Sequence, residues 1–342
     1  MIIPRRLNVS LLRLSDKIRY FIADFCAGLT IIELDVMNNT PTTEERVWAV
    51  LSHLSAIALG MGILLPIIGW SEQRRKSKYA SFQCLQALGY QSLGFTIWLL
   101  SYLLLLVVFV FVMVVSVGIT GNSGNNPDTF MGIWISILLI ITLGTFGFYL
   151  LLPVLAAIAC ALGKDFHYPI MGKRLAQYLG PKANDEWLNE DHEDRWVAAM
   201  GHFSVIIALW GMLAPLSAWI LQGKRSLFLK FQSIQTLVYQ VFVTLLFFGG
   251  IFVYIVGAFV LLSVVGLNRS TSINTSTGMT GLIIFLVFML VFLAIILIVP
   301  LFHIMGQWAG YRVLKGDNYH YPLLGNLVEK QISKFGSEEN RQ

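Results

Sequence analysis

The stretch EERVWAVLSHLS at residues 44–55 returns as EDRWVAAMGHFS at residues 193–204, and the similarity continues without a gap to residues 91 and 240. More than a third of the aligned positions are identical, among them His53 and His202. Self-similarity at one fixed offset is the signature of a duplicated structural unit. The sequence therefore predicts two tandem copies of one fold.

The composition indicates an integral membrane protein. Of the residues, 56% are hydrophobic and 13% charged, and the mean hydropathy is +0.70, whereas soluble domains carry about 25% charged residues. The net charge is +5, but the basic residues lie in short loops beside apolar runs, so we expect lipid headgroups and not nucleic acid as their partner. The three cysteines are far apart, and they predict neither a disulfide framework nor a metal pair.

Six apolar segments are each longer than the roughly 20 residues that cross a bilayer. We predict an all-α polytopic protein with two repeats of three long helical segments, which lie at residues 47–70, 85–119, 130–162, 196–221, 236–267 and 280–309. Each repeat closes on a similar motif, GKDFHYP at 163–169 and GDNYHYP at 316–322, followed by a short amphipathic helix. The expected order is an amphipathic interfacial segment (1–43), repeat 1 (44–179), a soluble linker (180–192), repeat 2 (193–332) and a disordered tail (333–342).

The number of crossings stays open at this stage. If every segment crosses, the 24 Lys and Arg residues divide about 10 to 14 between the two sides; if the first segment of each copy only dips in and returns, they divide about 23 to 1, with Arg269 the exception. Charge bias favours the dip, with a hinge near Leu59–Gly62 and its counterpart at Gly211 and Pro215. Segment length favours an ordinary span.

His53 and His202 are the most conspicuous polar residues within the apolar segments. An imidazole can ligate haem, a pigment magnesium or another metal. No second ligand accompanies either histidine at helical spacing, which favours a hydrogen bond to a neighbouring helix. We therefore expect no cofactor and no metal.

Gln83, Gln86 and Tyr90 recur in the second copy as Gln232, Gln235 and Tyr239. The spacing places each set on one helix face. We expect this face to pack between the two copies; the alternative is a hydrophilic vestibule for a polar solute. The basic loops are expected to be anchors at anionic headgroups, and they contain Arg74, Arg75, Lys76, Lys78, Lys224 and Arg225.

No Asp, Glu, Lys or Arg lies well inside an apolar segment, and no set of nucleophile, base and orienting group is visible. Coupled carriers usually need an ionisable residue at membrane depth, and a hydrolase needs the catalytic set. The sequence thus favours a protein without catalytic residues.

The order Arg-Val-Trp-Ala, Ser-His-Leu-Ser, a basic loop, Phe-Gln-x-x-Gln-Ala-Leu and a final Gly-x-x-x-x-Tyr-Pro resembles bacterial membrane domains related to the Tic family of the chloroplast inner-envelope import translocon. It covers nearly all of 44–178 and 193–330 and departs from the family pattern at Ser81 and Lys230. The resemblance implies a polytopic helical protein that is a channel-type or scaffolding part of a protein-handling complex.

The resulting hypothesis is a non-catalytic subunit or scaffold of a larger complex in the bacterial cytoplasmic membrane, with other membrane subunits as partners. Two alternatives remain: a passive translocation or solute pathway between the repeats, and a subunit that binds a pigment or cofactor through His53 and His202.

Overall fold

The computed structural model describes residues 40–120, 127–180, 187–270, 275–322 and 324–339. Within those ranges the chain is helical and contains no strand, which confirms the predicted all-α fold class. The predicted N-terminal interfacial helix falls largely on residues 1–39, outside the described part. The chain divides into two compact units, Met1–Glu193 and Asp194–Gln342.

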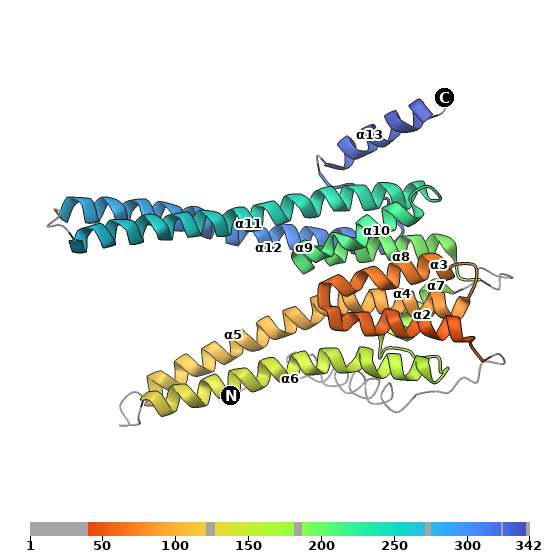
Figure 1. Cartoon of the computed structure of the whole chain (residues 1–342), viewed down its shortest axis with the longest axis horizontal. Helices are drawn as coiled ribbons and strands as arrows, with labels where there is room; N and C mark the ends of the chain where they lie inside the picture. The colour runs from red at the N-terminus through yellow and green to blue at the C-terminus, as the bar shows by residue number, and fades with distance from the viewer. Residues whose placement is uncertain (1–39, 121–126, 181–186, 271–274, 323, 340–342) are drawn as a thin grey trace, which may run out of the picture. The chain divides into compact units, whose positions relative to one another are not determined.

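The first unit begins with a bent helix pair. Its elements are α2 (Thr43–Leu54), the 3₁₀ segment η1 (Ser55–Ile63), α3 (Leu64–Gln73), α4 (Lys78–Gly89), the π-helical turn η2 (Tyr90–Gly94), α5 (Phe95–Thr120), α6 (Pro127–Ala161) and α7 (Met171–Leu179). A capping box starts α2, since Glu45 N donates to Thr42 Oγ1 and Thr42 N donates to the Glu45 carboxylate. Helix α2 packs on α3, α4 and α6 (Figure 1).

The second unit repeats this order with longer helices. Its elements are α8 (Glu190–Phe203), the 3₁₀ segment η3 (Ser204–Ile207), α9 (Ala208–Gly211), α10 (Leu213–Gln222), α11 (Leu227–Ser270), α12 (Thr275–Leu314) and α13 (Leu324–Glu339). Helices α11 and α12 lie side by side along their length (Figure 1). The boundary between the units falls inside α8, which begins within the segment expected to be the linker. Helix α13 continues past residue 332, where a disordered tail was expected.

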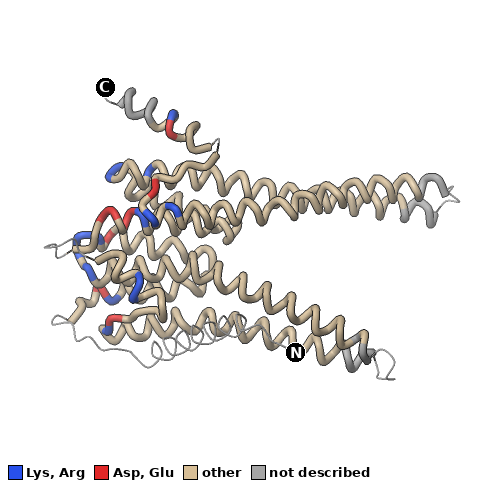
Figure 2. Tube along the Cα trace, turned by 180° about the vertical axis from the view of Figure 1, so that it is seen from behind, with Lys and Arg blue, Asp and Glu red and all other residues tan. Residues whose placement is uncertain are grey.

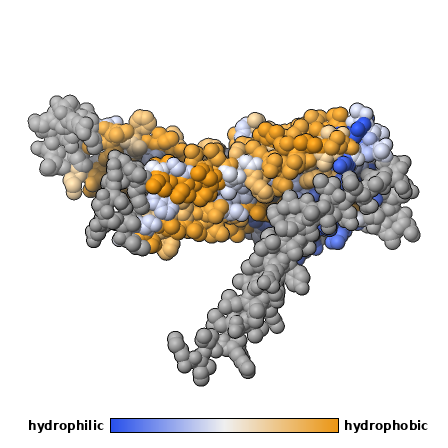
Figure 3. Space-filling view, turned by 90° about the horizontal axis from the view of Figure 1, so that it is seen from below, coloured by the Kyte–Doolittle hydropathy of each residue, from blue (hydrophilic) through white to orange (hydrophobic). Residues whose placement is uncertain are grey.

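The long helices present apolar side chains on their surfaces. Phe111 on α5 and Leu245 on α11 are each 68% exposed, and Figure 3 shows hydrophobic residues over most of one face. Among the described residues, five helices are long and apolar enough to cross a membrane, or six if the bent pair of the second unit counts as one span. Such surfaces are stable only in hydrocarbon, so the chain is an integral membrane protein in contact with lipid.

The first apolar segment of each copy is not straight. The backbone turns at Leu59 (φ 52°) and at Ala208 (φ 47°), which are equivalent positions at the offset of 149. In the second unit the two arms differ in direction by 115°. Charged residues gather at one end of each unit, away from the tips of the long helices (Figure 2). Each unit therefore has a charged end and long helices with apolar surfaces.

Candidate functional site

A buried polar cluster joins the closing motif to α2 and α4 in the first unit, and to α8 and α11 in the second. In the first unit the chain leaves α6 through Gly163 (φ +74°), a conformation that glycine adopts without strain. The next residues run back along α4, so that backbone carbonyls of the motif face its glutamines. Backbone groups without hydrogen bonds are costly in a membrane-embedded protein. Here the side chains of α4 form hydrogen bonds with the backbone of the motif.

Gln83 is the hub of this cluster in the first unit. Its Nε2 donates to Phe166 O at 3.0 Å and to Asp165 Oδ1 at 2.6 Å. Its Oε1 lies 2.9 Å from His53 Nε2 and accepts from Gln86 Nε2 at 3.2 Å. Every polar atom of the Gln83 amide therefore has a protein partner.

The second glutamine fixes the motif backbone. Gln86 Nε2 donates to Phe166 O at 2.8 Å, and Tyr168 N donates to Gln86 Oε1 at 2.9 Å. Gly172 lies beside this amide, because a Cβ there would come within 2.6 Å of Gln86 Oε1. The α4 face predicted from the sequence thus exists, but it binds its own closing motif.

The hydrogen bonds define the tautomer of His53. An amide oxygen only accepts, so Nε2 carries the proton that points to Gln83. Nδ1 then accepts from the Tyr168 hydroxyl at 3.0 Å. Burial raises the pKa of Tyr168 well above its ordinary value, which keeps the hydroxyl protonated as the donor. Both ring nitrogens of this fully buried histidine are therefore engaged.

Aromatic rings close the cluster. Tyr90 stacks on Tyr168 with centroids 4.4 Å apart and planes 11° from parallel, and its hydroxyl donates to Tyr149 O at 2.7 Å. The edge of His53 meets Tyr168 at a centroid distance of 5.4 Å. Such offset and edge contacts add to the burial of the rings themselves.

The second unit reproduces this geometry at equivalent positions. His202 Nε2 lies 3.0 Å from Gln232 Oε1, and His202 Nδ1 lies 2.9 Å from the Tyr321 hydroxyl. Gln235 Nε2 donates to Gln232 Oε1 at 2.6 Å, and Tyr239 stacks on Tyr321 at 4.0 Å. Burial again raises the pKa of Tyr321. The duplication therefore extends to individual hydrogen bonds.

The predicted role of the glutamine face needs correction. Packing between the two copies was expected, yet the partners of Gln83, Gln86, Gln232 and Gln235 described above lie in their own copy. These four side chains are fully buried. Their amides form the hydrogen bonds that water would otherwise supply to the non-helical backbone of the closing motif. A vestibule open to water would need those amides free.

A second pair of glutamines holds the bends. Gln91 Nε2 donates to Ser52 O at 3.0 Å and to Ser55 Oγ at 2.9 Å. Gln240 Nε2 donates to Gly201 O at 2.8 Å and to Ser204 Oγ at 3.1 Å. In the described part of the chain neither Oε1 has a hydrogen-bond donor, so each amide is fixed through its nitrogen.

The basic loops are partly neutralised by acidic residues of α8, the helix that contains the boundary between the units. Arg74 Nε lies 3.0 Å from Glu193 Oε2, with both side chains 4% exposed, and Arg75 pairs with Glu190. In the second unit Arg225 Nη2 lies 2.5 Å from Asp194 Oδ1. Arg74 thus serves the fold, whereas Lys76, Lys78 and Lys224 are exposed on the loops.

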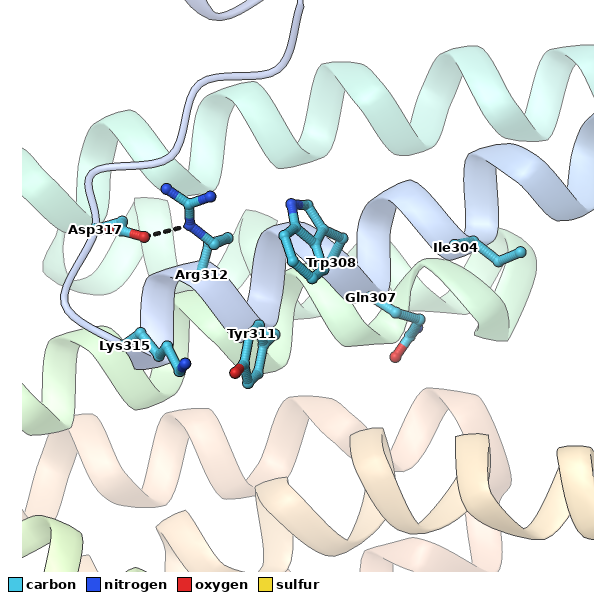
Figure 4. Close-up of a pocket in the computed structure, with 7 residues that line it drawn as sticks. All are labelled: Ile304, Gln307, Trp308, Tyr311, Arg312, Lys315 and Asp317. Carbon is cyan, nitrogen blue, oxygen red and sulfur yellow. Dashed lines mark hydrogen bonds and ion pairs between the residues drawn. The ribbon is translucent and has the colours of Figure 1, made fainter.

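An open pocket lies at the polar end of α12 (Figure 4), and its lining is Ile304, Gln307, Trp308, Tyr311, Arg312, Lys315 and Asp317. The Lys315 ammonium sits 4.8 Å from the centroid of Tyr311, and the Arg312 guanidinium 6.0 Å from that of Trp308. Arg312 also pairs with Asp317 (Figure 4). This lining of aromatic rings and cations is typical of a membrane interface.

The arrangement offers little for a metal or a tetrapyrrole. Within the described ranges no group of three or more His, Cys, Asp or Glu side chains could hold a metal ion. A histidine needs a free ring nitrogen to ligate, and neither His53 nor His202 has one. The cluster can position the closing motif and hold α4 and α11 to it.

Sequence reasoning missed several members of the cluster. Tyr168 and Tyr321 complete the histidine contacts, Gln91 and Gln240 hold the bends, and Glu193 receives the buried arginine. The tyrosines and glutamines could have been found from their identity between the two copies. Fixed helical spacing could not reveal them, because their partners are distant in the chain.

Comparison with protein families gives one match. A model described as the magnetosome magnetite crystal formation protein family matches residues 44–175 and again residues 193–328. Neither the search of curated proteins nor that of solved structures found a match. The expected relationship to the Tic family was wrong, because the motifs that suggested it lie inside these two matched ranges. Residues of those motifs form the buried cluster and both bends, so the motifs indicate the fold of the unit.

Proposed function

The chain belongs to the magnetosome magnetite crystal formation protein family, and from this premise we propose that it is a non-catalytic membrane protein that acts where magnetite crystals form. Both halves of the chain match the family, so the duplicated unit itself carries the family's role. We propose the magnetosome membrane as its location, in place of the general bacterial cytoplasmic membrane expected from composition.

The observation that carries a non-catalytic role is the closed hydrogen bonding of the buried cluster. A general base or nucleophile must reach its substrate, but His53 and His202 are fully buried and bonded through both ring nitrogens. Their neighbours are amides and phenols that bond to the closing motif. These polar groups support the fold, which leaves the surfaces for interaction.

Two kinds of surface suit a subunit or scaffold. The long helices carry exposed apolar side chains such as Phe111 and Leu245, which fit lipid tails and helices of other membrane subunits. The polar end carries exposed cations, including Lys76 and Lys224, which fit anionic headgroups. Contacts with both would hold the protein at a membrane and beside other subunits.

The test is deletion of the gene for this chain in its own organism, which the proposal requires to form magnetite. Electron microscopy of the deletion strain should find an altered number or size of crystals, and the wild-type gene should restore them. Detergent extracts of the complemented strain should yield the chain together with other membrane proteins. Unchanged crystals in the deletion strain would refute the proposed role, and recovery of the chain only as a free monomer would refute the scaffold.

A further inference from the structure

The bend in the first apolar segment occurs at the same place in both copies. Leu59 and Ala208 have positive φ values of 52° and 47°, a region in which a residue other than glycine is strained. Two equivalent positions share this strain although their side chains differ. The bend is therefore a property of the unit.

Close backbone contact locks each bend. A Cβ on Gly62 would lie 1.8 Å from Ser55 O, and a Cβ on Gly211 would lie 2.0 Å from Ser204 O. The arms approach so closely that only glycine fits at these positions. Straightening the segment would separate these atoms and break the bonds of Gln91 and Gln240.

The hydrogen bonds at the bend satisfy a requirement that hydrocarbon imposes. A non-helical turn frees backbone carbonyls, which inside a bilayer must be covered by protein. Gln91 Nε2 covers Ser52 O, Gln240 Nε2 covers Gly201 O, and Ser204 Oγ donates to Gly211 O at 2.8 Å. These backbone carbonyls at the turn are therefore hydrogen-bonded within the protein, as a position at membrane depth requires.

The arms have the length of one leaflet. Helix α2 has 12 residues and α3 has 10, which at 1.5 Å per residue amounts to roughly 18 Å and 15 Å. The hydrocarbon core is about 30 Å thick. Each arm therefore reaches about the middle of the bilayer, and neither crosses it alone.

The charge distribution agrees with a returning segment. With two crossings per copy, 41 of the 43 charged residues fall on one side of the membrane, and Asp128 and Arg269 are the exceptions. With three crossings the Lys and Arg residues divide about evenly between the sides. Short loops that face the cytoplasm carry the excess of Lys and Arg. The charged end of each unit in Figure 2 then faces the cytoplasm.

We propose that the bent pair of each unit, α2–α3 and α8–α10, is a wedge that enters one leaflet and returns to the same side. Its partner is the acyl chains of that leaflet, which meet exposed apolar residues near the bends: Ile57, Leu59, Met61, Leu209 and Trp210. Each unit crosses the bilayer twice, through α5 and α6 or through α11 and α12. The two copies are then parallel in the membrane, and the volume of both wedges is added to the same leaflet.

Labelling from each side of the membrane tests this topology in the full-length chain. In a Cys26→Ser background, single cysteines at exposed positions flank the wedges: Thr40→Cys and Lys76→Cys for the first, Asp191→Cys and Lys224→Cys for the second. Asn125→Cys and Ser272→Cys mark the connections between the long helices. Each variant is treated with a membrane-impermeant maleimide in right-side-out and in inverted vesicles.

We expect the four flanking cysteines to react from one side and those at 125 and 272 from the other. The parent chain retains only Cys84 and Cys160, both buried, and supplies the background. Labelling of Thr40→Cys and Lys76→Cys from opposite sides would overturn the first wedge. The same result for Asp191→Cys and Lys224→Cys would overturn the second. The outcome does not depend on any role in crystal formation.

Discussion

In the first copy Gln83 donates to the carboxylate of Asp165, whereas in the second copy Gln232 donates to the amide oxygen of Asn318 at 2.7 Å. The second copy adds a hydroxyl, since Thr236 Oγ1 lies 2.9 Å from His202 Nδ1. Both units thus have a hydrogen-bond acceptor for the first glutamine, which is charged in the first unit and neutral in the second. The two units therefore share the geometry of hydrogen bonding and differ in the charge around it.

The ion pairs at the basic loops differ more strongly. Glu193 accepts from Trp70 Nε1 at 3.3 Å and pairs with Arg74 in a site that is almost fully buried. The neighbouring Asp194 pairs with Arg225, whose side chain is 38% exposed. Two adjacent carboxylates therefore hold equivalent loops in surroundings of different polarity.

The long helices differ in packing. A Cβ on Gly257 would lie 2.5 Å from Phe288 Cβ, and one on Gly250 would lie 2.8 Å from Ile295 Cγ2, so α11 and α12 touch through glycines. On α6 a Cβ at Gly144 or Gly147 would meet nothing within 4 Å. Small residues allow close helix approach in membranes. Between the long helices, Gly250 and Gly257 of the second unit provide such an approach, whereas Gly144 and Gly147 of the first unit do not.

The largest effect is expected from the buried ion pair. Glu193→Gln removes the negative charge beside the buried Arg74 guanidinium and should lower the free energy of unfolding by about 3–5 kcal/mol. Asp194→Asn breaks the more exposed pair and should cost about 0–1 kcal/mol. Unfolding in mixed micelles, followed by circular dichroism, measures both variants. Equal losses would remove the distinction between the two loops.

A smaller difference is expected between the two glutamine hubs. Gln83→Leu leaves His53 Nε2 and the Asp165 carboxylate without this partner and should cost about 3 kcal/mol. Gln232→Leu should cost about 1–2 kcal/mol less, because Thr236 still reaches the ring of His202 and Asn318 is neutral. The same unfolding assay compares them.

Thr236→Ala provides the control for this difference. Combined with Gln232→Leu, it removes the hydroxyl that the first copy lacks and should bring the loss close to that of Gln83→Leu. If Thr236→Ala adds nothing to the loss, the hydroxyl does not compensate for the missing amide.

The sequence predicted the duplicated helical fold because hydropathy and repetition are local or periodic signals. It also placed Gln83, Gln86 and Tyr90 on one helix face. It could not predict that the face would meet the closing motif, since Asp165 and Tyr168 are about 80 residues away along the chain. The hinge of the first copy was expected within Leu59–Gly62, and the positive φ lies at Leu59, although no local propensity marks that residue for such a conformation.

Glycine packing gives a contrast between the long helices. Gly257→Leu would force α11 away from Phe288 and should destabilise the second unit by about 1–3 kcal/mol. Gly147→Leu points into space that the chain leaves empty, so the gain in helix propensity of nearly 1 kcal/mol should make it neutral or stabilising. The sign of the two changes in unfolding free energy is the measurement. Destabilisation by Gly147→Leu would indicate that α6 is packed against another subunit.

The smallest expected effect concerns anionic lipid at the ends of α12 and α6. The second unit places Arg312 and Lys315 beside Trp308 and Tyr311. The equivalent positions at the end of α6 are apolar: Leu155, Ile158 and Leu162 are exposed, and Ala159 is half-buried. The headgroup of an anionic lipid should therefore prefer the second unit. Because each cation near an anionic surface contributes about 1 kcal/mol, Lys315→Gln should weaken that preference about fivefold.

Arg312→Gln should have a lesser effect than Lys315→Gln, since Asp317 already neutralises Arg312. The measurement is the thermal stabilisation of the purified chain by added phosphatidylglycerol, with phosphatidylcholine as the uncharged reference. Leu162→Lys places a cation at the position of the first unit that corresponds to Lys315 and should increase the response to phosphatidylglycerol. An unchanged response in all three variants would mean that anionic lipids stabilise the chain through the basic loops, where the two copies are more alike.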